Sequence, residues 1–254
     1  MRSDTIKILI GDSPAEKPAL IYHHIPKCGG TTVRQAIKRN VDFNKMLKYH
    51  TYIWGNTAEN VKHTYGMNKD YVKALHGHFV YKHYESFLND DIYDFFQTTL
   101  VRNPISKVVS TYYYIKEDPK FKGLELRKLC EHISLKQFVD VNPKLHGGAY
   151  EHTHNYTLKW FTGDRESINK GKEMLDKFDV VGTLDDLEGF INLIGKKRGW
   201  QEMKETYDTH NRTKSKPSMD EITDEIKEKI AENNQKDMEL YEYAKEKFNE
   251  ELEG

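Results

Sequence analysis

The sequence predicts an α/β fold in which helices cover both faces of a central parallel sheet. Short apolar runs with the composition of buried strands alternate along the chain with segments of helical periodicity. This order is typical of strand–helix–strand units. The 254 residues suffice for one large domain of this class. Because no repeat or obvious linker interrupts them, a single domain over residues 1–254 is expected.

The first strand is expected at residues 19–25, an apolar run, and the helix that follows it at 31–40. Residues 40–70 are polar and aromatic without a clear period, and are expected to form loop and short helix. A second strand is expected over 72–80, broken at Gly77.

The second half of the chain continues the alternation. A third strand over 95–104 is stopped by Pro104, which also opens a helix over 105–118, since proline is tolerated in the first helical turn. Residues 177–200 hold a short strand, a capping turn and an amphipathic helix ending near Gly195 or Gly199. One long charged helix closes the chain, with apolar stripes at Ile222, Ile226 and Ile230 and at Tyr241, Ala244 and Phe248.

Composition restricts the function. The formal net charge is -1, so no global basic field attracts nucleic acid, and any anion site must be a local cluster. No window approaches the roughly 18 apolar residues of a membrane helix, and the first residues lack a signal-peptide core. The two cysteines, Cys28 and Cys130, suit a reducing compartment. We therefore expect a cytoplasmic protein.

The segment between the first strand and the first helix has the composition of an anion-binding loop. Gly29 and Gly30 let the backbone approach an anion at a helix start with unpaired N–H groups. Thr31 and Thr32 add hydroxyl donors, and Lys27 adds a movable charge. A tight turn with an exposed lysine is the simpler alternative. A kinase or GTPase fits poorly, because its lysine and its hydroxyl residue follow the second glycine.

A second anion cluster follows the third strand. Arg102 stands at the strand end and Ser110 two turns into the next helix. In a parallel sheet this end faces the same crevice as the first loop. Arginine can hold a phosphate by two parallel hydrogen bonds, and serine can add a third. Taken alone, a surface arginine and a helical serine would be the simpler interpretation.

Together these segments resemble the sulfotransferase superfamily. HIPKCGGTT (24–32) is similar to its 5′-phosphosulfate loop, and LVRNPISKVVSTYYY (100–114) to its 3′-phosphate motif. HGHF (76–79) and residues 178–194 are similar to segments of the heparan sulfate and uronyl 2-O-sulfotransferases, as are the loop at 210–218 and the final helix. The resemblance is collinear over roughly residues 20–248. The chain departs from the usual motifs at Cys28, where threonine is commoner, and at Lys107, where a second arginine is usual.

The resemblance implies a three-layer fold like that of the P-loop NTPases. It also implies the donor 3′-phosphoadenosine 5′-phosphosulfate (PAPS), which leaves as 3′-phosphoadenosine 5′-phosphate (PAP). Lys27 would neutralise charge growing on the bridging oxygen, so no metal is expected. The donor-binding residues implied are Lys27, Cys28, Gly29, Gly30, Thr31 and Thr32 for the 5′-phosphosulfate, Arg102 and Ser110 for the 3′-phosphate, and Arg212, Thr213 and Lys214 in a loop closing over the nucleotide.

The acceptor hydroxyl needs a base, and histidine suits that role near neutral pH. On an extended segment His76 and His78 share one face, and Gly77 leaves the backbone between them open. The resemblance makes His78 the catalytic base and His76 a supporting or substrate-contacting neighbour, with a core histidine as the alternative for His76. His23 and His24, on the first strand, are expected to be structural.

The sequence thus predicts an O-sulfotransferase that acts on a carbohydrate hydroxyl. A small-molecule or carrier-bound hydroxyl is the alternative acceptor, and a nucleotide kinase and a non-catalytic nucleotide- or glycan-binding module are remoter readings. His146, His152 and His154 are expected in a polar loop on the acceptor side rather than in a zinc site, because their spacing matches no standard site. The oligomeric state is left open.

Overall fold

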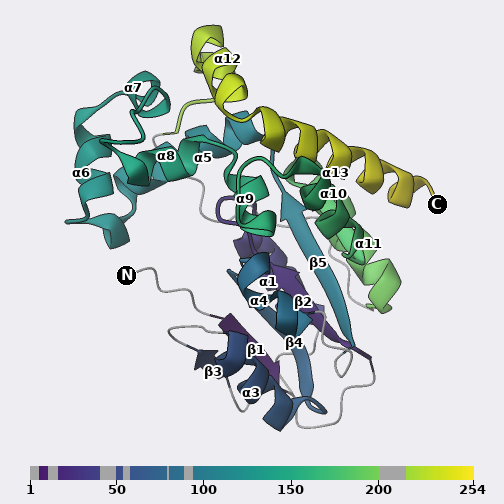
Figure 1. Ribbon diagram of the computed structural model, residues 1–254. Helices are drawn as coiled ribbons and strands as arrows, with labels where there is room; N and C mark the ends of the chain where they lie inside the picture. Colours follow the sequence, from purple (N-terminus) through teal and green to yellow (C-terminus); the bar gives the residue numbers. More distant parts are fainter. Residues whose placement is uncertain are drawn as a thin grey trace.

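A mixed six-stranded sheet lies at the centre of the part of the chain that the structure describes (Figure 1). The computed structural model describes residues 6–10, 17–40, 50–53, 58–78, 80–88, 94–200 and 216–254. The strand order across the sheet is β3-β1-β4-β2-β5-β6. The strands are β1 (Ile6–Ile10), β2 (Ala19–His23), β3 (His50–Ile53), β4 (Val72–Gly77), β5 (Phe95–Val101) and β6 (Val180–Thr183).

Four neighbouring strands, β4, β2, β5 and β6, run parallel. Tyr22 of β2 lies opposite His76 of β4 on one side and opposite Thr98 of β5 on the other. Carboxyl ends of parallel strands meet at one edge of a sheet, so the residues that follow β2, β4 and β5 are brought together. The predicted parallel sheet is confirmed, and β4 ends at Gly77, which leaves His78 in the loop beyond it.

Two antiparallel strands extend the sheet beyond β4 and were not predicted. β1 pairs antiparallel with both β4 and β3. β3 lies in the stretch expected to be loop and short helix, where only the helix, α3, was foreseen. A strand of four residues such as β3 is too short to show a period-two pattern, and its pairing with β1 makes it a strand.

Helices cover both faces of the sheet, as predicted. On one face α1 and α11 pack around Leu20 and Tyr22 of β2. On the other face α3, α4, α9 and α10 pack around Ile21, because successive strand residues point to opposite sides. These helices are α1 (Gly30–Asn40), α3 (Ala58–Asn68), α4 (Tyr81–Leu88), α9 (Tyr156–Thr162), α10 (Ile168–Asp176) and α11 (Leu187–Arg198).

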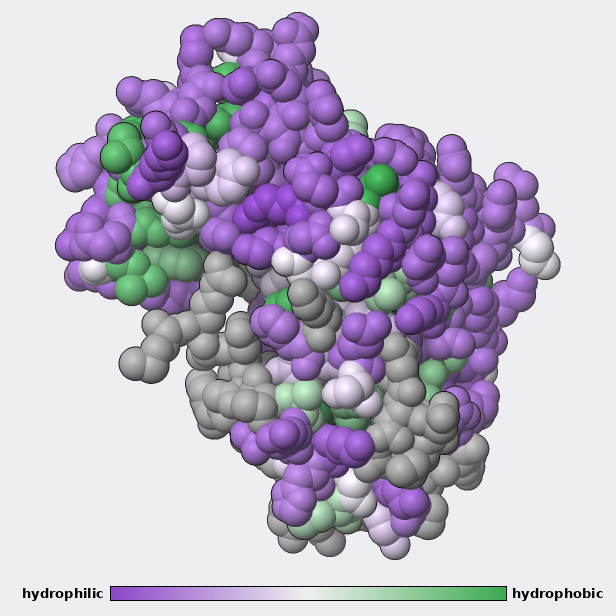
Figure 2. All heavy atoms as spheres, in the orientation of Figure 1, coloured by the Kyte–Doolittle hydropathy of each residue, from purple (hydrophilic) through white to green (hydrophobic). Residues whose placement is uncertain are grey.

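A separate hydrophobic cluster joins the helices at the upper left of Figure 1. Asn103 caps the first of them, α5, by accepting hydrogen bonds from the N–H groups of Ile105 (3.0 Å) and Ser106 (3.4 Å). Pro104 opens this helix, as predicted. Figure 2 shows apolar atoms gathered over α6 to α8, on a face that is otherwise mostly hydrophilic. The helices of this cluster are α5 (Pro104–Glu117), α6 (Glu125–His132), α7 (Leu135–Val139), α8 (Gly147–Thr153) and α12 (Asp224–Asn233).

The prediction of one long closing helix is wrong: α12 ends at Asn233 and a second helix, α13 (Gln235–Glu253), follows. Asn234 between them is buried and has non-helical dihedral angles. Its side-chain amide donates to the carbonyl groups of Thr153 (2.7 Å) and Ile230 (2.8 Å), and its side-chain oxygen accepts from the N–H of Asn155 (2.9 Å). These long-range bonds stabilise the break, and the two apolar stripes belong to two helices.

A buried carboxylate on α13 joins three helices. Asp237 accepts hydrogen bonds from the N–H groups of Thr157 and Leu158, both at 2.8 Å, and so caps α9. Lys107 of α5 is also buried, with its ammonium 4.0 Å from the centroid of the Tyr156 ring. Burial raises the pKa of Asp237 and lowers that of Lys107, while their opposite charges act against both shifts.

Asp237→Ala should therefore destabilise the fold by about 3–5 kcal/mol, because it leaves a buried lysine without its counter-charge and two helical N–H groups without an acceptor. Asp237→Asn keeps one acceptor oxygen and should cost less. The matched control is Glu239→Ala on the same helix, which removes a solvent-exposed pair with Lys172 and should cost about 0–1 kcal/mol. Urea unfolding at pH 7 measures all three, and equal losses for Asp237→Ala and Glu239→Ala would contradict the assignment.

Candidate active site

The loop between β2 and α1 turns through a left-handed backbone conformation at two residues. Lys27 has a φ of 67° and Gly29 a φ of 75°. The N–H of Cys28 donates to the carbonyl of Ile25 (3.2 Å), and the N–H of Thr32 to that of Gly29 (3.0 Å). A Cβ at Gly29 would also lie 2.6 Å from a terminal methyl group of Leu184, and the left-handed conformation favours glycine there.

Gly30 is required for a different reason, which sequence analysis did not foresee. A Cβ there would lie 2.0 Å from the ring of His24, which occupies the space beside the first turn of α1. The first turn of α1 carries no acidic residue, so the partial positive charge of this helix end is not opposed from its own helix. The loop therefore combines a close-packed backbone with a helix start suited to an anion.

Arg102, at the end of β5, donates a hydrogen bond to this loop, in line with its predicted position at the sheet edge. Its Nη1 donates to the carbonyl of Lys27 (2.9 Å), and its Nε donates to Oγ of Ser106 (2.8 Å). Burial lowers the pKa of its guanidinium. Sequence analysis did not predict a role for Ser106. Its position four residues after Arg102, in the turn capped by Asn103, could have indicated the contact. Ser110 lies buried one turn further along α5.

The other predicted donor-binding residues differ in what they offer. Thr31 is half-buried and Thr32 is buried. The side chain of Cys28 lies wholly within the hydrophobic core, and burial raises the pKa of its thiol to about 11. Position 28 can therefore contribute only backbone groups. The remaining predicted residues, Arg212, Thr213 and Lys214, lie outside the described residues.

The ammonium of Lys27 lies against an aromatic ring at the mouth of the loop. Its Nζ is 3.5 Å from the centroid of Tyr114 on α5. Burial, together with the positive charges of Arg102 and Lys120, lowers the pKa of Lys27 to about 8. An anion placed beside Lys27 would oppose these effects and raise its pKa again.

Three histidines meet beside the loop. His78 donates through Nδ1 to the carbonyl of His24 (2.8 Å), and since a carbonyl can only accept, Nδ1 carries the proton and Nε2 the lone pair. The two rings stack with centroids 4.5 Å apart, and Trp160 stands edge-on to His78 at 6.1 Å. His76, at the end of β4, lies edge-on to His24 at 6.4 Å.

His76 and His78 thus both lie beside His24, as expected for residues on one face of an extended segment. His24 itself was expected to be structural on the first strand, but it follows the end of β2 and forms the centre of this group. Burial, together with the nearby His78 and His76, holds the pKa of His24 well below its usual value, so the His24 ring is neutral. His23 is a core residue bonded to Gln97 (3.1 Å), and its pKa is lowered to about 3 by burial.

The polar loop expected at His146, His152 and His154 is instead a helix: His152 lies in α8, and the other two flank its ends. His152 stacks on Tyr156, and His154 stacks on Tyr150. Within the described ranges no three His, Cys, Asp or Glu side chains are grouped as metal ligands.

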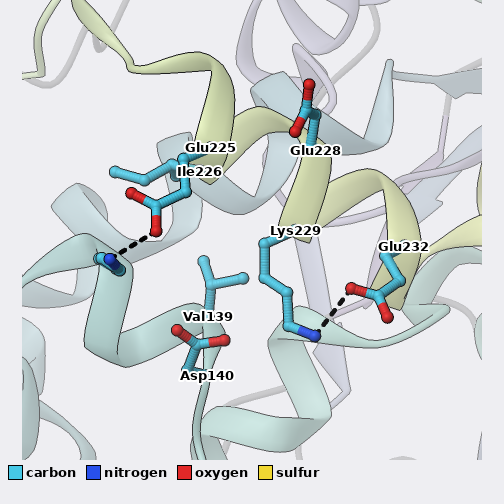
Figure 3. Close-up of a pocket in the computed structure, with 8 residues that line it drawn as sticks. Val139, Asp140, Glu225, Ile226, Glu228, Lys229 and Glu232 are labelled. Carbon is cyan, nitrogen blue, oxygen red and sulfur yellow. Dashed lines mark hydrogen bonds and ion pairs between the residues drawn. The ribbon is translucent and has the colours of Figure 1, made fainter.

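A hollow between α7 and α12 is lined by ion-paired side chains (Figure 3). Lys136 pairs with Glu225 at 2.6 Å, and Lys229 with Glu232 at 2.8 Å. It shares no residue with the loop or the histidines, and its carboxylates outnumber its lysines, which does not suit an anionic donor. The chemistry of the site therefore lies at the edge of the sheet.

The fold is that of an α/β protein of the phosphate-binding-loop class, with a lysine, an arginine and histidines at the carboxyl edge of a parallel sheet. The model of the sulfotransferase family matches residues 14–244, nearly the whole chain, so the chain belongs to the sulfotransferase family. It is an enzyme of sulfuryl transfer to a hydroxyl-bearing acceptor. None of the curated proteins compared with the chain matches it. Among the described helices, none combines the length and apolar character needed to cross a membrane.

The depressed pKa of Lys27 makes anion binding pH-dependent in a definite direction. At pH 8.5, above its pKa of about 8, Lys27 is mostly neutral. A bound polyanion raises the pKa of Lys27, so the amine takes up a proton from solution. PAP should therefore bind with uptake of a substantial fraction of a proton at pH 8.5 and much less at pH 6.5. Calorimetry in two buffers of different ionisation enthalpy measures this uptake. Lys27→Met should abolish the uptake and the control Lys144→Met should retain it; equal uptake in both would exclude Lys27 as its source.

Proposed function

We propose that this sulfotransferase moves the sulfuryl group of PAPS to a hydroxyl of a carbohydrate acceptor, with His78 as general base. One observation carries the proposal. Two backbone carbonyls of a single loop, at His24 and Lys27, accept hydrogen bonds from His78 and from Arg102. Because the two carbonyls lie three residues apart, a candidate base and a candidate phosphate-binding arginine are tied to one short segment.

The donor assignment is supported by the charges around the loop. The described hydrogen bonds of Arg102 use its Nε and Nη1, so further N–H groups of the guanidinium remain for a phosphate. Lys27 adds a second cation, and the start of α1 adds N–H groups. PAPS carries two separate anionic ends, and we assign the 3′-phosphate to Arg102 with Ser110 and the 5′-phosphosulfate to Lys27 with residues 28–32. Arg212, Thr213 and Lys214 are kept as nucleotide contacts on the strength of the family resemblance.

In the proposed step the acceptor oxygen forms a bond to sulfur as the bond from sulfur to the bridging oxygen breaks. Nε2 of His78 takes the proton of the acceptor hydroxyl, and Lys27 stabilises the negative charge left on the bridging oxygen. His24 fixes the tautomer of His78 through its carbonyl, and we assign His76 a supporting role. Positioning and charge neutralisation account for the rest of the rate, as in phosphoryl transfer.

The carbohydrate acceptor rests on the similarity of the His76–His78 segment to 2-O-sulfotransferases. A panel of saccharides and small hydroxyl compounds, incubated with labelled PAPS, tests it directly. Transfer to saccharides is expected. Transfer to small hydroxyl compounds alone would replace the carbohydrate with a small-molecule or carrier-bound acceptor while leaving the donor assignment intact.

For the donor, PAP should raise the melting temperature in the presence of a chelator, because a ligand that binds only the folded state stabilises it. Arg102→Ala should weaken PAP binding by about 1.5–3 kcal/mol, the scale of a charged hydrogen bond. Binding of adenosine 5′-phosphosulfate, which lacks the 3′-phosphate, should change little. The control Arg127→Ala removes an arginine that pairs with Glu131 on α6 and should affect neither ligand. If ATP with Mg²⁺ protects as well as PAP, the donor assignment is wrong.

For the base, His78→Ala should lower turnover by about 10²–10⁴-fold, the usual contribution of a positioned general base, with PAP affinity nearly unchanged. In the wild type kcat/KM should fall in acid as Nε2 becomes protonated, and this limb should disappear in the variant. His132→Ala, an exposed histidine on α6, is the control. Measuring sulfate transfer against pH decides the matter. Near-normal turnover with an intact acidic limb in His78→Ala would remove His78 from the reaction.

A further inference from the structure

The three consecutive tyrosines of α5 point to three different environments. Tyr112 is buried and donates to the carbonyl of Ile133 at 2.7 Å. Tyr113 packs at the border of the helical cluster. Tyr114 alone meets the loop, with its half-buried ring against the ammonium of Lys27 at 3.5 Å. Only the third tyrosine can therefore act on the site.

The ring of Tyr114 also contacts the short 3-10 turn that follows α5. Phe121, in the short 3-10 helix Pro119–Phe121, meets it edge-on with centroids 5.4 Å apart. Asp118 caps that turn by accepting from the N–H of Lys120 (3.0 Å). The ammonium of Lys120 bonds to the hydroxyl of Tyr114 and lies 4.4 Å from the ring centroid. One aromatic ring thus contacts two lysines from different segments.

The charged surroundings of Lys27 are mostly of its own sign. Arg102 at the end of β5 and Lys120 in the 3-10 turn both disfavour its protonated form, whereas Asp118 favours it. A cation over the face of an aromatic ring is attracted to the negative face of its π-system. The ring of Tyr114 therefore gives the half-buried ammonium of Lys27 an attractive contact beside two repelling charges.

We propose that Tyr114 is a positioning residue for Lys27: its ring holds one side of the ammonium at the mouth of the loop and leaves the other side for an anion, while Lys120 weakens that hold. The role of Lys27 in sulfuryl transfer rests on the proposed function. The contact between Tyr114 and Lys27 does not, so the two are tested separately. A lysine side chain has four rotatable bonds, and holding its ammonium in place before the reaction lowers the entropy lost on reaching the transition state.

The test that needs no activity is the titration of Lys27 in the ligand-free protein. Its acetylation rate, followed against pH by peptide mass spectrometry, gives the midpoint. Tyr114→Leu keeps apolar bulk but removes the ring, and should move the midpoint below about 8. Lys120→Gln removes a like charge and should move it above that value. Tyr114→Phe retains the ring and should stay closer to the wild type than Tyr114→Leu.

The second arm measures transfer from PAPS. Tyr114→Leu should lower kcat by about threefold to tenfold with KM for the donor little changed, within the range of a lost cation–π contact, and Tyr114→Phe should restore most of it. Three outcomes would each overturn the proposal. The Lys27 midpoint could stay unmoved in Tyr114→Leu, it could shift with the same sign in Tyr114→Leu and Lys120→Gln, or Tyr114→Leu could bind PAP more tightly. Absence of transfer in the wild type would instead reject the proposed function, and the titration would still decide the role of Tyr114.

Discussion

The loop between β2 and α1 is the constraint on which the rest of the site depends. Its backbone is left-handed at Lys27 and Gly29, and the carbonyl groups of His24 and Lys27 accept hydrogen bonds from His78 and Arg102. β4 and β5 flank β2 on either side, so the residues after them reach the loop from opposite directions. The parallel sheet brings the segments close, and the carbonyl groups fix their orientation.

Much of this arrangement follows from local sequence. Pro104 and the Asn103 cap identify the start of α5, and Gly199, in a left-handed conformation with φ of 66°, ends α11 at one of the two predicted positions. Arg102 could be assigned to the edge of the sheet because strand ends in a parallel sheet share that edge. The placement of His76 and His78 on the same face followed from the period of an extended segment. Each of these inferences uses contacts between residues close in sequence or a rule of sheet topology.

The features that were missed depend on contacts between distant segments. Asn234 interrupts the closing helix because it bonds to Thr153 and Asn155, about 80 residues earlier in the chain, and helix periodicity cannot reveal such partners. His24 joins the histidine group only because β2 and β4 are neighbours. Tyr114 contacts Lys27 only because α5 packs beside the loop. Propensity and pattern describe single elements, whereas these residues acquire their roles when elements pack together.

The contact between His24 and Gly30 links two positions that are six residues apart. The imidazole fills the space that any side chain at position 30 would need. The two positions therefore share one volume, and related chains should vary them as a pair: a residue larger than glycine at position 30 requires a small residue at position 24. A small residue there would take away the ring stacked on His78. Evolutionary change at the second glycine of the loop is thereby coupled to the histidine group, although glycine itself has no side chain to contribute.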